Sequence, residues 1–271
     1  MQHLASIDFE DWYHDVEHVS PVDGDAFKRA FDRQVACAMD VLRSTSTRAT
    51  FFVLGRTAER HPGWVRDIAA AGHEIATHGY GHERVTSLTP AQFRADVRRS
   101  VDVIAGITGT RPVGYRAPFF SVTAREAAWL YDILADEGFS YSSSVSPGRA
   151  SSFSDHALAI TPVTTSSGRT IVEAPLSAVE WRGRRLPFAG GGLWRALPLP
   201  IIARGIRRLE REHRAMVIYL HPHEFDPLPL RSDRGMRRNL YVNFGRASIA
   251  DKLRAVLREF RFQPLGKALA T

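Results

Sequence analysis

The chain has 271 residues, of which 44% are hydrophobic and 24% charged, and its formal net charge is +7. This composition is typical of a globular protein and excludes a disordered, fibrous or collagen-like chain. No apolar run reaches the roughly 18 residues that a membrane-spanning helix needs. The first eleven residues already include three acidic ones, where a secretory signal peptide would be basic and then apolar. We therefore expect a soluble, cytoplasmic protein.

The cysteine content and the basic charge exclude two further classes. A single cysteine, Cys37, rules out an internal disulfide framework and a cysteine-based zinc site. Arginine supplies 33 of the 36 basic residues, spread along the whole chain, and no nucleic-acid motif accompanies them. We interpret the charge as solvated or ion-paired and expect no nucleic-acid partner.

Short apolar runs alternate with amphipathic helical patterns along the chain. The predicted strands are 3–9, 49–54, 74–77, 113–115, 139–142, 170–175 and 215–220. The predicted helices are 25–43, 56–71, 90–107, 123–137, 201–213 and 247–260, with Thr89 as the N-cap of the third. Such an alternation predicts a parallel α/β barrel, formed here by residues 1–271 as a single domain.

The segment at about 143–200 differs in composition and is predicted to be an insertion. It is rich in Ser, Gly and Pro, and the run Gly190-Gly191-Gly192 is its strongest turn signal. The apolar stretch 193–202 contains several prolines, and we expect it to pack over the barrel rather than to contact a membrane surface.

Polar residues follow four of the predicted strands, which is where the chemistry of a parallel barrel gathers. These strand ends carry Asp8, Glu10, Asp11, His78, His82, Arg116, His221, His223 and Glu224. Packing alone would favour apolar or turn residues at such positions.

These side chains suit a metal-assisted hydrolase. His78 and His82 are four residues apart, and in a helical turn both could reach one metal ion. With one carboxylate they form a two-His-one-carboxylate set, which suits zinc and equally iron, cobalt, nickel or manganese. Of the carboxylates Asp8 and Asp11, one could bind the ion while the other acts as the base that activates water. His221 could then be the acid.

In these motifs the chain resembles the polysaccharide deacetylases with a NodB-homology domain, carbohydrate esterase family 4. It is most similar to the exopolysaccharide-associated branch, whose first motif reads D-x-E-D-[WY] and whose last reads H-P-x-E. The matching segments, in the family's order, are Asp8–Trp12, His78–His82, Arg116–Phe119 and Leu220–Glu224. Two further segments are similar, Pro187–Gly192 and the tail around Arg258–Phe262, so the resemblance spans almost the whole chain.

The resemblance implies a distorted (β/α) barrel of the NodB type that removes acetyl groups from N-acetylated sugars. The implied catalytic residues are Asp8 as general base, Arg116 as its partner, the Phe119 backbone N–H at the oxyanion and His221 as general acid. The implied ligands of one divalent ion, with zinc preferred, are Asp11, His78 and His82. Trp12, Tyr80 and Phe119 are the expected sugar-binding aromatics.

Two departures from the family pattern leave alternatives open. The family's first motif has adjacent aspartates, whereas two residues separate Asp8 from Asp11, so Glu10 is the alternative ligand. Ser142 stands where the fourth motif usually has an Asp that supports the acid histidine. A serine cannot stabilise an imidazolium as a carboxylate does, so His221 would need Glu173, Asp155 or Glu224 instead.

The leading functional prediction is hydrolysis of the N-acetyl group of an acetamido sugar in a surface or exopolysaccharide glycan or its precursor. A sugar precursor or lipid-linked glycan is the expected substrate rather than a finished wall polymer. Two alternatives remain: a cyclic ureide or imide amidohydrolase of the same fold, and a non-catalytic glycan-binding relative.

Overall fold

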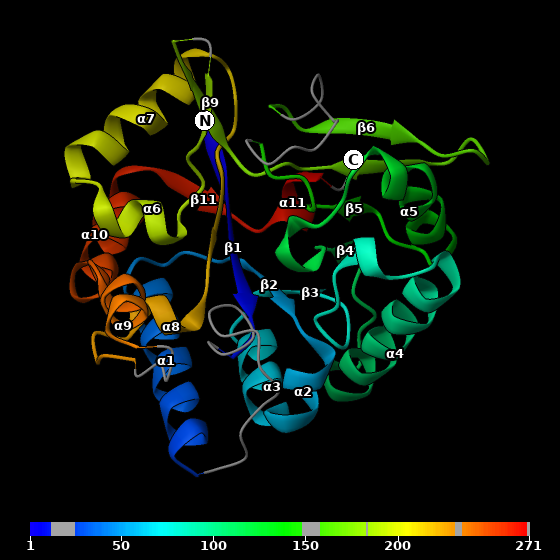
Figure 1. Cartoon of the computed structure of the whole chain (residues 1–271), viewed down its shortest axis with the longest axis horizontal. Coiled ribbons are helices and arrows are strands. Elements are labelled where there is room, and N and C mark those ends of the chain that lie inside the picture. Colours follow the sequence, from blue (N-terminus) through cyan, green and yellow to red (C-terminus); the bar gives the residue numbers. More distant parts are fainter. Residues whose placement is uncertain (12–24, 148–157, 183, 231–234, 270–271) are drawn as a thin grey trace.

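The structure, a computed structural model, describes residues 1–11, 25–147, 158–182, 184–230 and 235–269. A curled, mainly parallel sheet lies at its centre with helices outside it (Figure 1). The sheet strands are β1 (Gln2–Phe9), β2 (Thr50–Val53), β3 (Glu74–Thr77), β4 (Gly114–Tyr115), β5 (Tyr141–Ser142), β6 (Thr161–Thr164), β7 (Thr170–Glu173), β10 (Val217–Leu220) and β11 (Arg261–Gln263). Their order is β10-β1-β2-β3-β4-β5-β7-β6, with β11 also paired to β1. The predicted distorted α/β barrel is confirmed.

The two ends of the curled sheet are linked by single backbone contacts rather than by a regular strand pair. The Ser177 N–H donates to the Val217 carbonyl at 3.3 Å, and the Tyr219 N–H donates to the Ala189 carbonyl at 2.8 Å. Gly190 also forms a parallel bridge to Tyr219, where a Cβ would lie 2.5 Å from the Tyr219 carbonyl oxygen. Its φ of 117° is likewise open mainly to glycine. The glycine run that begins at Gly190 thus lets the chain pass close to β10.

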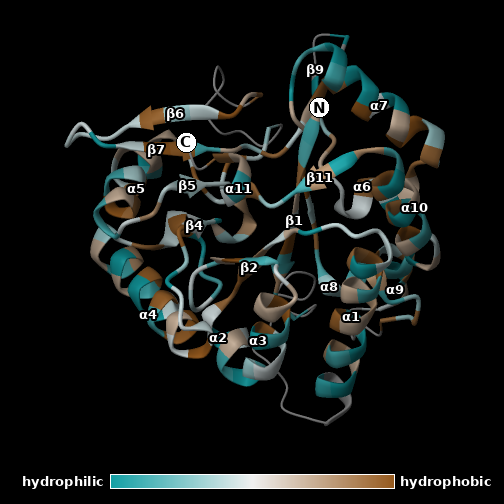
Figure 2. Cartoon of the chain, turned by 180° about the vertical axis from the view of Figure 1, so that it is seen from behind, coloured by the Kyte–Doolittle hydropathy of each residue, from teal (hydrophilic) through white to brown (hydrophobic). Residues whose placement is uncertain are grey.

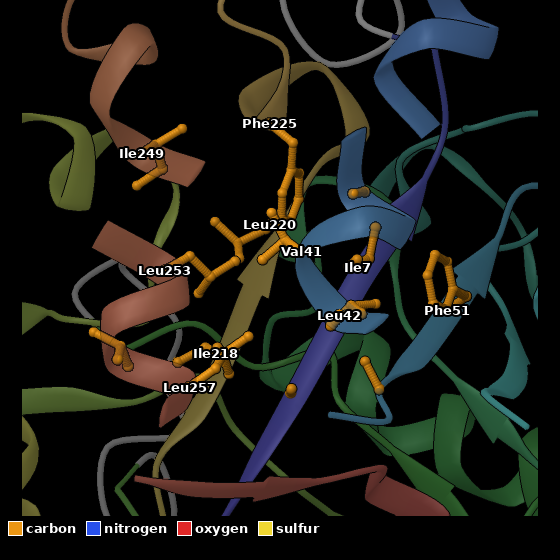
Figure 3. Packing of buried hydrophobic residues seen from close by; sticks show 14 of the residues in the cluster. Ile7, Val41, Leu42, Phe51, Ile218, Leu220, Phe225, Ile249, Leu253 and Leu257 are labelled. Atoms are coloured by element: carbon orange, nitrogen blue, oxygen red, sulfur yellow. The ribbon is translucent and has the colours of Figure 1, made fainter. Parts of the chain in front are cut away.

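Alternation along β1 separates an outer apolar face from an inner polar one. Ile7 and Phe9 face the outer helices, where they join the largest cluster of buried hydrophobic residues. Figure 3 shows Ile7 of β1 and Ile218 of β10 among residues from the surrounding helices. Leu4 faces the barrel interior, and Ser6 and Asp8 share its face. The inner face therefore delivers polar side chains to the carboxyl end of the strand.

The outer helices carry hydrophilic and hydrophobic residues along the same element, as Figure 2 shows for α1 and α4. Their bounds are α1 (Asp25–Ser44), α2 (Gly55–Arg60), α3 (Pro62–Ala70), α4 (Pro90–Thr108), α5 (Ala124–Asp136), α6 (Gly191–Ala196), α7 (Leu199–Arg211), α8 (Pro222–Phe225), α9 (Met236–Asn243), α10 (Arg246–Glu259) and α11 (Leu265–Leu269). Thr89 caps α4 as predicted, because its hydroxyl accepts the Gln92 N–H. No helix in the described ranges is both long and apolar enough to cross a bilayer.

The prediction of one helix over 56–71 is wrong, because that segment forms α2 and α3. The break lies at His61, whose φ of −127° and ψ of 51° are not helical. Proline at position 62 disfavours the helical conformation for the residue before it and is well suited to start a helix. The segments before and after His61 are helical as predicted, and only the break at His61 was not predicted.

The segment at 143–200 contributes to the main sheet as well as to a separate hairpin. Strand β7 pairs in parallel with β5, and β6 pairs antiparallel with β7. Strands β8 (Ala178–Trp181) and β9 (Arg184–Pro187) form a two-stranded sheet of their own. The predicted strand at 170–175 corresponds to β7, whereas β6, β8 and β9 were not predicted.

Stability should fall as pH falls, because two imidazoles are held neutral in the fold. Burial lowers the pKa of His73 to about 4, and the Arg48 charge adds to the effect. Its Nδ1 accepts the Ala49 N–H at 3.2 Å, a bond that protonation at Nδ1 removes. Burial also lowers the pKa of His61 to about 4. In the unfolded state these two histidines bind protons from about pH 6.5 downward, whereas in the folded state they bind them only near pH 4. The free energy of unfolding is therefore highest above about pH 6.5 and declines toward pH 4.

Replacing His73→Asn should reduce this pH dependence by on the order of 2 kcal/mol, since asparagine keeps an acceptor but does not titrate. Urea unfolding at pH 7 and pH 5 measures the effect, and His61 with the other histidines whose pKa is lowered by burial should account for what remains. Equal pH dependence in the variant and the wild type would mean that His73 is not held neutral.

Candidate active site

The polar strand ends meet at one mouth of the barrel. Asp8 is the last but one residue of β1, and Glu10 comes directly after that strand. His78, Arg116 and His221 come directly after β3, β4 and β10. Each of these side chains is buried, with Arg116 completely inaccessible. The strands are parallel in this part of the sheet, so their carboxyl ends deliver the side chains to the same place.

Asp8 and Arg116 form a buried ion pair. Arg116 Nη1 donates to Asp8 Oδ1 at 2.6 Å and to Ser6 Oγ at 2.8 Å, while Nη2 donates to Ser143 Oγ at 2.8 Å. Burial by itself raises the pKa of Asp8, but the charge and the hydrogen bond of the Arg116 guanidinium oppose burial, and the pKa is lowered. Asp8 is therefore an ionised carboxylate, as a general base must be, and the predicted pairing with Arg116 is present.

Three buried side chains form a set that could hold a metal ion: Glu10, His78 and His82. One ligand atom from each lies within 4.8 Å of the others. His82 Nε2 is 2.7 Å from Glu10 Oε2, and His78 Nε2 is 4.0 Å from the same oxygen. The donors are two imidazoles and one carboxylate, which is a common set for a catalytic divalent ion.

The orientation of His78 fits this use. Its Nδ1 lies 2.8 Å from the Arg116 carbonyl oxygen, so Nδ1 carries the proton and the Nε2 lone pair points toward Glu10. Burial lowers the pKa of His78 despite the nearby Asp8 and Glu10 carboxylates. A neutral imidazole with an available nitrogen is what metal coordination requires.

The carboxylate beside the histidines is Glu10, the alternative in the sequence analysis, and not the preferred Asp11. Glu10 follows Asp8 by two residues and so keeps to the inner side of the strand. The backbone bends there, as the Glu10 N–H donates to the Asp8 carbonyl at 3.1 Å. Asp11 is also buried, but it does not belong to the three-residue set.

The segment from His78 to His82 is a loop rather than the expected helical turn. Gly79 and His82 both have positive φ, 76° and 62°. The two imidazole centroids nevertheless lie 5.4 Å apart. Asp96 of α4 holds the loop, because its carboxylate accepts the Tyr80 and Gly81 N–H groups at 2.8 and 3.0 Å. Asp96 has no sequence signal, since only the fold brings it to the loop.

Glu224 is the carboxylate beside His221. Its Oε2 lies 3.4 Å from His221 Nδ1 and accepts the His221 N–H at 3.1 Å. The other oxygen is 3.7 Å from Nε of Arg195, which belongs to α6. His221 Nε2 points the opposite way and lies 3.5 Å from Glu10 Oε1. His221 thus stands between the candidate ligands and a buried acidic support.

Glu173 and Ser142 lie on the outer face of the sheet and support a loop instead. Tyr141 packs in the barrel interior, so Ser142 points outward, where its hydroxyl donates to Ser144 Oγ at 2.8 Å. Glu173 accepts the Ser144 and Val145 N–H groups at 2.8 and 3.0 Å. Burial raises the pKa of Glu173. Asp155, the third proposed support for His221, lies outside the described residues.

The predicted sugar-binding aromatics have different surroundings. The Phe119 ring lies 4.4 Å from the His82 ring, and its backbone has a φ of 57°. Tyr80 instead donates to Glu59 Oε2 at 2.8 Å and packs under the Arg99 guanidinium. These contacts place Tyr80 in the helical layer, which fits a structural role better than a sugar-binding one. Trp12 lies outside the described residues.

Two family models match the chain, one on each side of residue 140. Residues 25–132 match the polysaccharide deacetylase model, and residues 143–270 match a domain of unknown function, DUF3473. The Helicobacter pylori peptidoglycan deacetylase is 35% identical over 99 residues, which cover 36% of this chain and 32% of that protein. The Bacillus cereus peptidoglycan-N-acetylglucosamine deacetylase is 29% identical over 91 residues, covering 34% and 33%. The chain thus matches about one third of the length of these relatives.

Solved structures show the same fold over the whole chain. A putative polysaccharide deacetylase from Mycobacterium smegmatis superposes with a TM-score of 0.67 at 22% identity, covering 100% of this chain and 90% of the other. Puue allantoinase superposes with a TM-score of 0.64 at 15% identity, covering 99% and 90%. The chain therefore shares this fold throughout, and its residues 25–132 are similar to the polysaccharide deacetylase family.

Proposed function

We propose that this protein hydrolyses the N-acetyl group of an acetamido sugar in a surface or exopolysaccharide glycan or its precursor, with release of acetate. The observation that carries the proposal is that an ionised, arginine-held Asp8 and a separate histidine, His221, are both buried at the set formed by Glu10, His78 and His82, with His221 Nε2 3.5 Å from Glu10 Oε1. Amide hydrolysis needs a base for water and an acid for the departing nitrogen.

Glu10, His78 and His82 would hold one divalent ion, with zinc preferred and cobalt, nickel, iron or manganese also compatible with the ligands. The fit rests on their buried donor atoms and on the fixed Nδ1–H of His78. When bound, such an ion polarises a carbonyl oxygen and lowers the pKa of water.

The protein's own residues divide the proton transfers between them. Asp8 would accept the proton of the attacking water, and Arg116 keeps its carboxylate ionised and oriented. His221 would donate a proton to the nitrogen as the C–N bond breaks, giving acetate and the free amine. Phe119, whose ring contacts His82, lies where it could contact the sugar. Its backbone N–H is the proposed oxyanion donor, and Trp12 remains a proposed sugar contact.

The two candidate carboxylate ligands can be separated by a matched pair of variants. Glu10→Gln should lower the metal content per chain at least about tenfold, because it removes the negative charge of a proposed ligand. Asp11→Asn should retain the wild-type content. Elemental analysis after dialysis measures both, and His78→Ala/His82→Ala serves as the metal-free reference. The opposite ranking would make Asp11 the ligand.

The role of Asp8 is tested by acetate release from a soluble N-acetylglucosamine oligomer. Asp8→Asn should lower kcat by about 10²–10⁴ while the metal content is unchanged, since only the base is lost. Activity kept in this variant would exclude Asp8 as the base. A wild-type protein that instead turns over a cyclic ureide, or binds the oligomer without turnover at any metal, would replace this proposal by one of the two alternatives.

Glu224 is proposed to position His221. Glu224→Gln should lower kcat about tenfold or more with little change in KM, because the amide cannot stabilise an imidazolium as a carboxylate does. Glu224→Asp should recover part of the loss. The exposed Glu180→Gln is the matched control and should leave kcat unchanged. If the two Glu224 variants lose activity only in proportion to their loss of thermal stability, Glu224 caps α8 and does not position His221.

A further inference from the structure

Exposed apolar side chains gather on one part of the surface, around α6 and α9. In the described ranges, ten large hydrophobic side chains are exposed, and half of them belong to this part. They are Leu193, Met236, Leu240, Tyr241 and Phe244. Helices α6, α8 and α9 lie on the same side of the molecule in both views (Figures 1 and 2). Single exposed apolar residues are ordinary, but a cluster of this kind marks a binding surface.

The cluster surrounds a cavity of about 590 Å³, which we call the α6–α9 cavity. Leu193, Leu240, Tyr241 and Phe244 line it, with Gly192 and Tyr219 among the remaining lining residues. Two arginines, Arg195 and Arg237, also contribute to the lining, and among the residues that the structure describes no Asp or Glu does. The cavity therefore offers hydrocarbon contact together with positive charge.

The α6–α9 cavity is connected to the candidate active site through two of its lining residues. The Tyr219 ring lies 5.6 Å from the His221 ring. Arg195 lies 3.7 Å from Glu224, which contacts His221. Arg195 also donates to the Val242 carbonyl of α9 at 2.7 Å, so it joins the cavity wall to the acid side of the site.

We propose that the α6–α9 cavity binds the lipid part of the substrate, and that the substrate is an N-acetylated sugar joined through phosphate to a hydrocarbon chain. The apolar lining would take the chain and Arg237 the phosphate, while the sugar reaches His221 beyond Tyr219. This inference rests on the proposed function, because it names the substrate class of the same site.

The occupant follows from the shape and charge of the cavity. A carbohydrate subsite needs hydrogen-bonding side chains, whereas here aliphatic and aromatic residues predominate. Arg195 is already paired with Glu224, which leaves the Arg237 guanidinium of the lining to complement an anion, and arginine is well suited to phosphate.

Binding can be measured without turnover by titrating the protein with decyl phosphate below its micelle concentration. Calorimetry should show decyl phosphate binding at least about tenfold more tightly than inorganic phosphate and more tightly than neutral decyl glucoside. Equal affinity for decyl phosphate and inorganic phosphate would overturn the role of the apolar lining. Equal affinity for decyl phosphate and decyl glucoside would overturn the role of the phosphate.

Surface variants localise the effect. Leu240→Asn/Phe244→Asn changes two exposed side chains and should weaken decyl phosphate binding about tenfold or more. Arg237→Gln should weaken decyl phosphate but not decyl glucoside. Val113→Asn, an exposed apolar residue that precedes β4, is the control and should bind like wild type. Unchanged binding in the first two variants would place the ligand elsewhere.

Two further measurements separate the competing outcomes. Acetate release from the soluble N-acetylglucosamine oligomer tests the proposed function alone, whereas the titration tests the α6–α9 cavity alone, so either can fail while the other stands. Sedimentation of the wild type and of Leu240→Asn/Phe244→Asn tests a second copy as the occupant. A dimer that the double variant converts to monomer would overturn the proposal.

Discussion

The buried pair between Arg116 and Asp8 is the interaction on which the rest of the site depends. A charge pair without solvent access is stable only when its remaining polar atoms are also satisfied. Arg116 meets this condition through Ser6 and through the hydroxyl and carbonyl of Ser143. Its own carbonyl then fixes the ring of His78. One residue thus orients both the proposed base and a proposed ligand, and links strands β1, β3, β4 and the loop after β5.

The parallel sheet explains why so many charged groups can be buried together. Its strands deliver inner-face side chains to one mouth, while the outer faces supply apolar packing against the helices. Asp8 therefore lies beside Ile7 in sequence but in a separate environment. The cost of burying Glu10 is offset by His82, and a bound cation would offset it further. Elsewhere on the outer face, Glu173 is stabilised by backbone N–H groups instead.

The residues of the candidate site follow apolar runs that can be recognised as strands in the sequence. Asp8, His78, Arg116 and His221 were found in this way and by their family motifs. The geometry favours Glu10 over the preferred Asp11, because Glu10 shares the inner side of the strand with Asp8 and lies beside the histidines. Other residues reach the site only because the fold brings distant segments together; these are Arg195, Asp96 and Glu224. Arg195 and Asp96 sit in ordinary helical sequence, and Glu224 could be named only as one of three supports for His221.

The two halves of the chain supply different parts of the proposed chemistry. The base and the ligands come from residues 8–82 and are held by Arg116, within or before the segment that matches the deacetylase model. The acid, its support Glu224 and the α6–α9 cavity all come from the segment that matches DUF3473. The segment up to residue 132 would then supply the base and the metal ligands, whereas the segment from residue 143 would determine which N-acetylated molecule is bound. In the second half, Arg195 joins substrate binding to acid catalysis, because its guanidinium lines the α6–α9 cavity and also contacts Glu224, the carboxylate beside His221.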